Sequence, residues 1–143
     1  MSRFRILVAD QAEAVFYDSP DLSAEPHEIA RITDPVAHLH DRDLMSDRPG
    51  RSYESVGGAR HALERENDPR QREAVKFARR IARRLDEARR KDEFDSLVVV
   101  AGPAFLGLMR AELSRPTRAK VVREIHKDLV HGPLASLREH LAA

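Results

Sequence analysis

The sequence predicts an α/β fold in which helices cover both faces of a mixed sheet. Leu97–Ala101 is an unbroken apolar run of strand length, rich in β-branched valine, so this strand needs cover on both faces. Gly102-Pro103 then interrupts the strand, and Pro103 suits the first turn of a helix. Apolar residues follow at helical spacing, at Phe105, Leu106, Met109 and Leu113.

Three further strands are predicted before this central one. Arg5–Asp10 carries apolar side chains on both faces, and Gln11-Ala12 is short enough for a tight hairpin into a second strand, Glu13–Asp18. Ser19–Ala24 is turn-like, and Glu28–Thr33 alternates well enough for a third strand. Short connections between consecutive strands indicate an antiparallel meander.

The next segment, Asp34–Asn67, is polar, contains several Pro and Gly residues and shows no sustained period. Long connections of this kind are usually functional or disordered. Asp68 then suits the N-cap of a long helix with Pro69 as its first residue. The predicted buried stripe of this helix is Val75, Ala78, Ile81, Ala82 and Leu85.

The end of the chain predicts one more strand and one more helix. Ala119–His126 is typical of a partly exposed strand, and Pro133 opens a helix with Leu134, Leu137 and Leu141 on one face. The predicted order is β-β-β-α-β-α-β-α, with helices packed on a mixed sheet. Antiparallel strands joined to parallel ones through right-handed crossovers form a ribonuclease H-like layout. We expect one domain over residues 1–143 with a long loop at 34–67.

Composition excludes several classes of chemistry. The chain has 143 residues, a formal net charge of +1 and no cysteine, which excludes disulfides, thiolate zinc sites and thiol nucleophiles. No apolar run approaches the roughly 18 residues of a membrane span. We therefore expect a cytoplasmic protein that does not enter membranes.

A ribonuclease H-like order suggests a two-metal nuclease, which needs several converging carboxylates. Asp10 ends the first strand and is a weak catalytic candidate, but Gly102 stands where the central strand would supply a second ligand. The alternative for Asp10 is to accept backbone N–H groups in the turn. His38–Asp43 alternates imidazoles and carboxylates and suits either a divalent metal or a solvated loop. We expect no metal and no cofactor.

Two segments are candidates for binding. The long helix carries a dense basic face, centred on Arg79, Arg80, Arg83 and Arg84, that could lie along a phosphate backbone. The alternative is a solvated helix whose arginines pair with acidic residues one turn away. The second candidate is a loop with two adjacent glycines, whose backbone can approach a partner closely or form a flexible tip. This binding loop is Gly57, Gly58, Ala59, Arg60 and His61.

Several segments, in order along nearly the whole chain, resemble the bacterial host attachment protein family. They are Ile6–Asp10, Pro49–Ser52, Gly57–Glu64, Asp68–Ala78, Phe94–Arg110 and Val122–His131. The resemblance implies a requirement for attachment of plant-associated bacteria to host cells. The family is also similar to the middle domain of class-one peptide chain release factors, which has a ribonuclease H-like fold. That similarity implies a role on ribosomes.

The release-factor domain carries Gly-Gly-Gln on a loop before a long helix and promotes peptidyl-tRNA hydrolysis. Gly57-Gly58 has a comparable place, but Ala59 stands where the glutamine would be. Because alanine has no amide to orient water, hydrolase activity is in doubt.

We therefore expect a non-enzymatic, cytoplasmic binding protein that contacts the ribosome or structured RNA and affects host attachment indirectly. The rival hypothesis is an enzyme, either a peptidyl-tRNA hydrolase-like protein or a metal-dependent nuclease that uses Asp10. A third hypothesis is a homodimer formed through the edge of the sheet.

Overall fold

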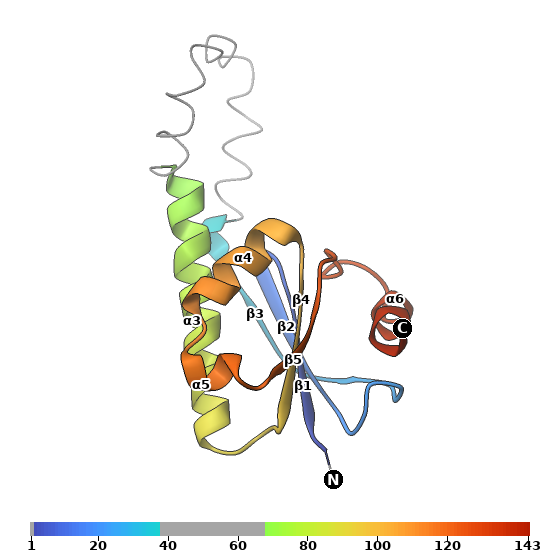
Figure 1. Cartoon of the computed structure of the whole chain (residues 1–143). Coiled ribbons are helices and arrows are strands. Elements are labelled where there is room, and N and C mark those ends of the chain that lie inside the picture. Colours follow the sequence, from blue (N-terminus) through green and yellow to red (C-terminus); the bar gives the residue numbers. More distant parts are fainter. Residues whose placement is uncertain (1, 38–67) are drawn as a thin grey trace.

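A computed structural model describes residues 2–37 and 68–143 of the chain (Figure 1). The strands within these residues are β1 (Phe4–Ala9), β2 (Glu13–Ser19), β3 (His27–Thr33), β4 (Ser96–Ala101) and β5 (Val121–Ile125). The helices are α3 (Pro69–Arg90), α4 (Pro103–Glu112), α5 (Arg115–Arg118) and α6 (Leu134–Ala142). The fold is therefore α/β, as the sequence predicts.

The strands form one open mixed sheet in the order β3-β2-β1-β4-β5. β2 is antiparallel to both β1 and β3, which confirms the predicted meander. β4 is parallel to β1 on one side and to β5 on the other. The apolar run at the centre of the sequence is thus a central strand.

Helices cover both faces of this sheet. α3, α4 and α5 lie on one side of it and α6 on the other (Figure 1). Alternate residues of the central strands face the two cores: Leu7 and Val99 pack with the buried residues of α3 and α4. Ile6 and Val98 pack instead with Leu137 and the rest of the α6 core. This three-layer packing explains why β1 and β4 are apolar on both faces.

α3 begins as predicted, but its buried face differs from the predicted one. The Asp68 side chain accepts a hydrogen bond of 2.9 Å from the Arg70 N–H, and Pro69 is the first helical residue. Val75 is only half-buried, so its place in the predicted stripe is wrong. The other four predicted residues are buried, and Phe77, whose ring centre is 6.2 Å from that of Phe105, is buried with them. The buried residues of α3 are Ala74, Phe77, Ala78, Ile81, Ala82, Leu85 and Ala88.

Three other details depart from the predictions. Leu134 is 39% exposed, because it is the first residue of α6 and lies before the turn that packs on the sheet. Residues 35–37 are helical, at the start of the predicted irregular connection. The short helix α5 follows α4 directly, and the Ser114 hydroxyl caps it by accepting from the Thr117 N–H.

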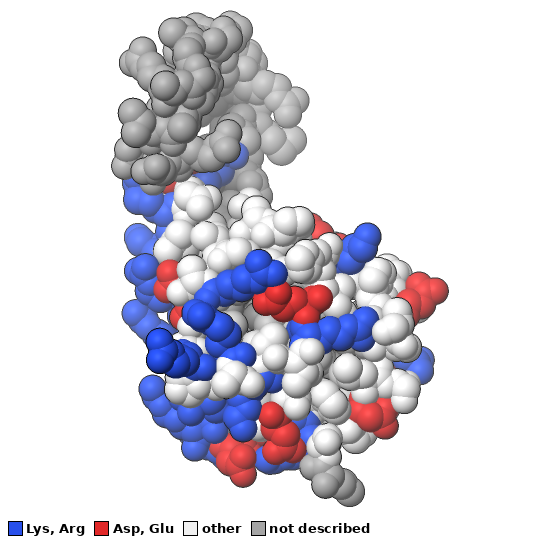
Figure 2. Space-filling model, viewed as in Figure 1, with Lys and Arg blue, Asp and Glu red and all other residues white. Residues whose placement is uncertain are grey.

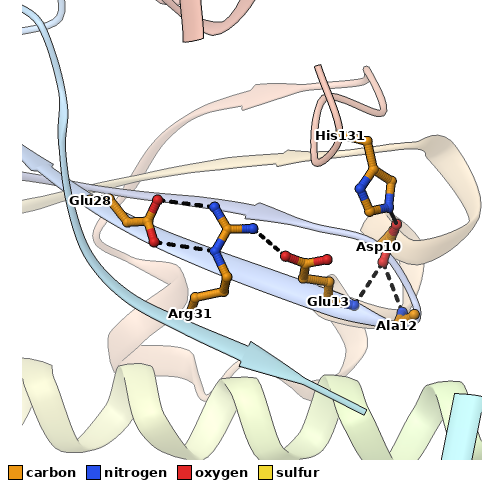
Figure 3. Close-up of polar contacts among 6 residues, drawn as sticks. All are labelled: Asp10, Ala12, Glu13, Glu28, Arg31 and His131. Atoms are coloured by element: carbon orange, nitrogen blue, oxygen red, sulfur yellow. Dashed lines mark hydrogen bonds and ion pairs between the residues drawn. The ribbon is translucent and has the colours of Figure 1, made fainter. Parts of the chain in front are cut away.

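Both edges of the sheet contain a register shift, and each shift leaves one exposed aliphatic residue unpaired. On β3 this residue is Ile29, between the paired residues Glu28 and Ala30. On β5 it is Val122. Beside the β3 shift, Arg31 forms ion pairs with Glu28 and Glu13, and these hydrogen bonds raise the pKa of Arg31 (Figure 3). Such bulges interrupt the regular pairing that an edge strand offers to another chain.

Candidate nucleic-acid interface

The solvent side of α3 carries a row of cations. Residues three, four or seven positions apart lie on one side of a helix, so these side chains follow one line over about 27 Å of α3 at about 1.5 Å per residue. Figure 2 shows Lys and Arg gathered along the α3 side of the molecule. We call this set the α3 basic row: Arg72, Lys76, Arg79, Arg83 and Arg90, all exposed.

The arginines predicted to form the basic face differ in their partners. Arg79 forms an ion pair of 3.0 Å with Glu112 of α4, so its acidic partner comes from another helix. Arg80 donates a hydrogen bond of 3.3 Å to the Thr33 carbonyl at the end of β3. Arg83 has no ion-pair or hydrogen-bond partner among residues 2–37 and 68–143, and neither has Lys76. Arg90 of the same row likewise has none among these residues, so these three cations are available to a ligand.

Two of the predicted arginines lie over aromatic rings. The guanidinium carbon of Arg80 is 6.0 Å from the centre of the Phe77 ring, and that of Arg84 is 5.1 Å from the centre of the Phe16 ring. Cation–π contacts of this kind hold a guanidinium in place without neutralising its charge. The sequence offers no signal for the Phe16 contact, because this residue is on β2, far from α3 in the chain.

A hydrogen-bond network fixes α5 against the C-terminal half of α3. Asp86 of α3 accepts hydrogen bonds from the hydroxyls of Ser114, at 2.5 Å, and of Thr117. Burial raises the pKa of Asp86, but these hydrogen bonds outweigh burial and hold that pKa below its ordinary value. The network places two exposed cations of α5, Arg115 and Arg118, beside the end of α3, where they extend the positive surface.

Asp10 lies in a separate hollow of about 520 Å³, where β1 and β4 end and α4 begins. One of its carboxylate oxygens accepts hydrogen bonds of 2.8 Å from the N–H groups of both Ala12 and Glu13, as the turn interpretation predicts (Figure 3). The other oxygen is 3.7 Å from Nε2 of His131. Asp128 also lines the hollow.

The described residues of this hollow do not form the arrangement of a two-metal nuclease. Gly102 occupies the end of β4, as the sequence shows, and supplies no carboxylate there. Among residues 2–37 and 68–143, no three His, Asp or Glu side chains are placed to hold a metal ion together. The candidate metal segment His38–Asp43 and the binding loop Gly57–His61 lie outside the described residues.

The α3 basic row and the Asp10 hollow both lie within one matched region of sequence. The family model described as "Protein required for attachment to host cells" matches residues 5–141. The chain belongs to this host attachment family. The match covers every described strand except the first residue of β1, so the family resemblance of the sequence is confirmed. A search of curated proteins gave no match to this family member. None of its described helices is long and apolar enough to cross a membrane.

Proposed function

We propose that this host attachment family member is a non-enzymatic, cytoplasmic protein that binds RNA through the α3 basic row, including RNA on the ribosome, and affects host attachment indirectly. The observation that carries the proposal is the alignment of exposed cations along α3, of which Lys76 and Arg83 have no partner among the described residues. Neutralising several phosphates with aligned cations releases condensed counterions, and this release favours binding without reading the base sequence.

Because the net charge of the chain is small, attraction to RNA depends on the local arrangement of cations. A formal net charge of +1 supplies little attraction for a polyanion by itself. Glu124 and Glu13 form ion pairs away from α3, with Arg110 and Arg31, whereas Glu112 pairs with Arg79 of the row. The positive charge offered to RNA therefore comes mainly from Lys76, Arg83 and Arg90, which have no ion-pair partner among the described residues.

The proposal includes a ribonuclease H-like identity for the fold and a kinship with the middle domain of release factors. The strand order β3-β2-β1-β4-β5, with a meander on one side and parallel strands on the other, supports this identity. The enzyme and homodimer hypotheses stay predictions. For the enzyme, the described residues add no support, since one oxygen of Asp10 is already engaged by two backbone N–H groups.

Charge reversal on α3 tests the proposed function. In the Lys76→Glu/Arg83→Glu variant, binding of a fluorescently labelled RNA should weaken by at least about tenfold at low salt, because two phosphate contacts become repulsions. Fluorescence anisotropy measures the affinity, and co-sedimentation with ribosomes should fall in parallel.

The matched control for this experiment is Arg138→Glu, an exposed arginine of α6 on the opposite face of the sheet. It should change RNA affinity less than about twofold, because it lies on the other side of the sheet from the proposed contact (Figure 1). The proposal fails if the native protein binds neither RNA nor ribosomes, or if both variants lose binding equally.

A further inference from the structure

We propose that a hollow between β3 and the C-terminal half of α3 holds one unpaired nucleobase, so that the RNA bound by this protein is single-stranded. This inference rests on the proposed function and names its ligand class. The hollow has a volume of about 310 Å³. The residues that carry the inference are Phe16, Ile29, Arg84, Lys91 and Glu93, all of which line it.

The first support is a guanidinium that is held in place but not neutralised. Arg84 lies over the Phe16 ring, and no carboxylate is within ion-pair distance of it among the described residues. Phe16 is fully buried, whereas Arg84 is exposed. Unpaired bases stack on the planes of arginine side chains as they do on aromatic rings. Arg84 can therefore stack with a base on its solvent side while Phe16 supports it from the core.

The second support is an apolar side chain at the same hollow. Ile29 is 48% exposed, which makes it one of the few large exposed aliphatic residues in the described part of the chain. The register shift between β2 and β3 leaves Ile29 without a strand partner. An exposed aliphatic residue beside a cationic wall offers van der Waals contact to the face of a base, whose ring is apolar and whose edges are polar.

The third support is a set of hydrogen-bonding groups in the wall. Buried Arg5 binds Asp18 at 2.5 Å and Glu93 at 3.3 Å, and thereby holds the Glu93 carboxylate at the hollow. Lys91 adds an ammonium donor, which also forms an ion pair of 3.5 Å with Glu87, a second carboxylate that lines the hollow. Nucleobase edges carry both donors and acceptors, which a carboxylate and a cation can satisfy together. In a duplex the Watson–Crick edges and the base faces are already engaged, so the hollow favours unpaired bases.

The sugar-phosphate chain would have to pass around α3 to reach this hollow from the α3 basic row. Arg83 and Arg84 are successive residues, so their exposed side chains start about 100° apart around the helix. A phosphate on Arg83 would bring a base onto Arg84 only if the strand turned across the helix.

The test compares single-stranded and duplex RNA of one sequence that contains 2-aminopurine, whose fluorescence reports stacking. The native protein should bind the single strand about tenfold more tightly, because only an unpaired base gains stacking on Arg84. Arg84→Lys keeps the charge but removes the planar group, and Ile29→Ser changes only an exposed position. Each variant should weaken single-strand binding about three- to tenfold, reduce the 2-aminopurine signal and leave duplex binding unchanged.

Arg138→Lys is the control, because it makes the same chemical change on α6, away from the hollow. Equal affinity of the native protein for single strand and duplex would overturn the inference, and so would native-like binding by both Arg84→Lys and Ile29→Ser. If those variants bind normally while Lys76→Glu/Arg83→Glu loses binding, the inference fails and the proposed function stands. If the native protein binds no RNA, both fail.

Discussion

Single side chains connect the helices of this protein in ways that set its stability. Asp86 is the clearest case, because it accepts hydrogen bonds from the hydroxyls of Ser114 and Thr117 at α5. Thr117 is fully buried. Arg89 donates a further hydrogen bond of 3.0 Å to the same Thr117 hydroxyl. A buried hydroxyl that loses a partner retains its desolvation cost, so the network should be sensitive to small changes.

Replacing Asp86 by Asn tests this network. The variant should lower the free energy of unfolding at neutral pH by about 1–3 kcal/mol, because hydrogen bonds to a charged acceptor are lost. The pKa of Asp86 is held below its ordinary value in the folded state, so its stabilising effect is present above the unfolded pKa of about 3.9 and is lost as the pH falls through the folded pKa. Urea titrations of both proteins, repeated at decreasing pH, measure the difference, which should shrink in acid.

Asp92→Asn provides the control, since this aspartate is 82% exposed and its positive φ of 58° suits Asn equally well. Its effect should stay within about 0.5 kcal/mol, as for other surface substitutions. An Asp86→Asn protein as stable as the native one at neutral pH would show that the network contributes nothing.

At the scale of the elements, the central strand and its helix were predictable, and the contacts between distant elements were not. The apolar run of β4 and the Gly102-Pro103 break are local signals, and both appear at the expected places. Asp68 likewise caps α3 as its sequence indicates. Four of the five residues predicted for the stripe of α3 are buried, but Phe77 was not predicted to join them, because its contact with Phe105 is determined only by the tertiary structure.

The candidate site was also predictable only in part. The cations of α3 are visible in the sequence, because helical spacing alone places them on one side. Their partners come from three other elements: Glu112 from α4, Thr33 from β3 and Phe16 from β2. No spacing rule predicts such contacts, so the distinction between paired and available arginines required the structure.

The C-terminal helix α6 depends on one cation from the sheet. Arg123 of β5 donates hydrogen bonds of 2.7 Å to the carbonyls of His140 and Leu141, which the helix itself leaves without partners. Arg123→Ala should therefore speed hydrogen exchange of the α6 amides while those of β4 stay protected. Arg138→Ala, on the exposed side of α6, should leave exchange unchanged. Equal protection of α6 in the two variants would contradict this role of Arg123.

In the whole molecule, the two faces of the sheet are covered by helices with different surface features. The α3, α4 and α5 layer carries the basic row and the hollow beside β3, whereas α6 covers the other face of the sheet (Figures 1 and 2). Among the described residues, a row of exposed cations thus gathers on the α3 side, although the formal net charge of the chain is +1. Substitutions of Arg138 on α6 are suitable controls because α6 lies on the other side of the sheet from α3 (Figure 1).

The salt dependence of RNA binding tests the central claim, that the α3 basic row binds RNA phosphates, most directly. For single strands, the slope of log affinity against log salt concentration is about −0.7 per phosphate neutralised. The native protein should give a steep negative slope, and Lys76→Ala/Arg83→Ala should make it shallower by about 1.4, or two phosphates. A slope that is identical in the two proteins, or binding by the native protein that does not respond to salt, would contradict the account.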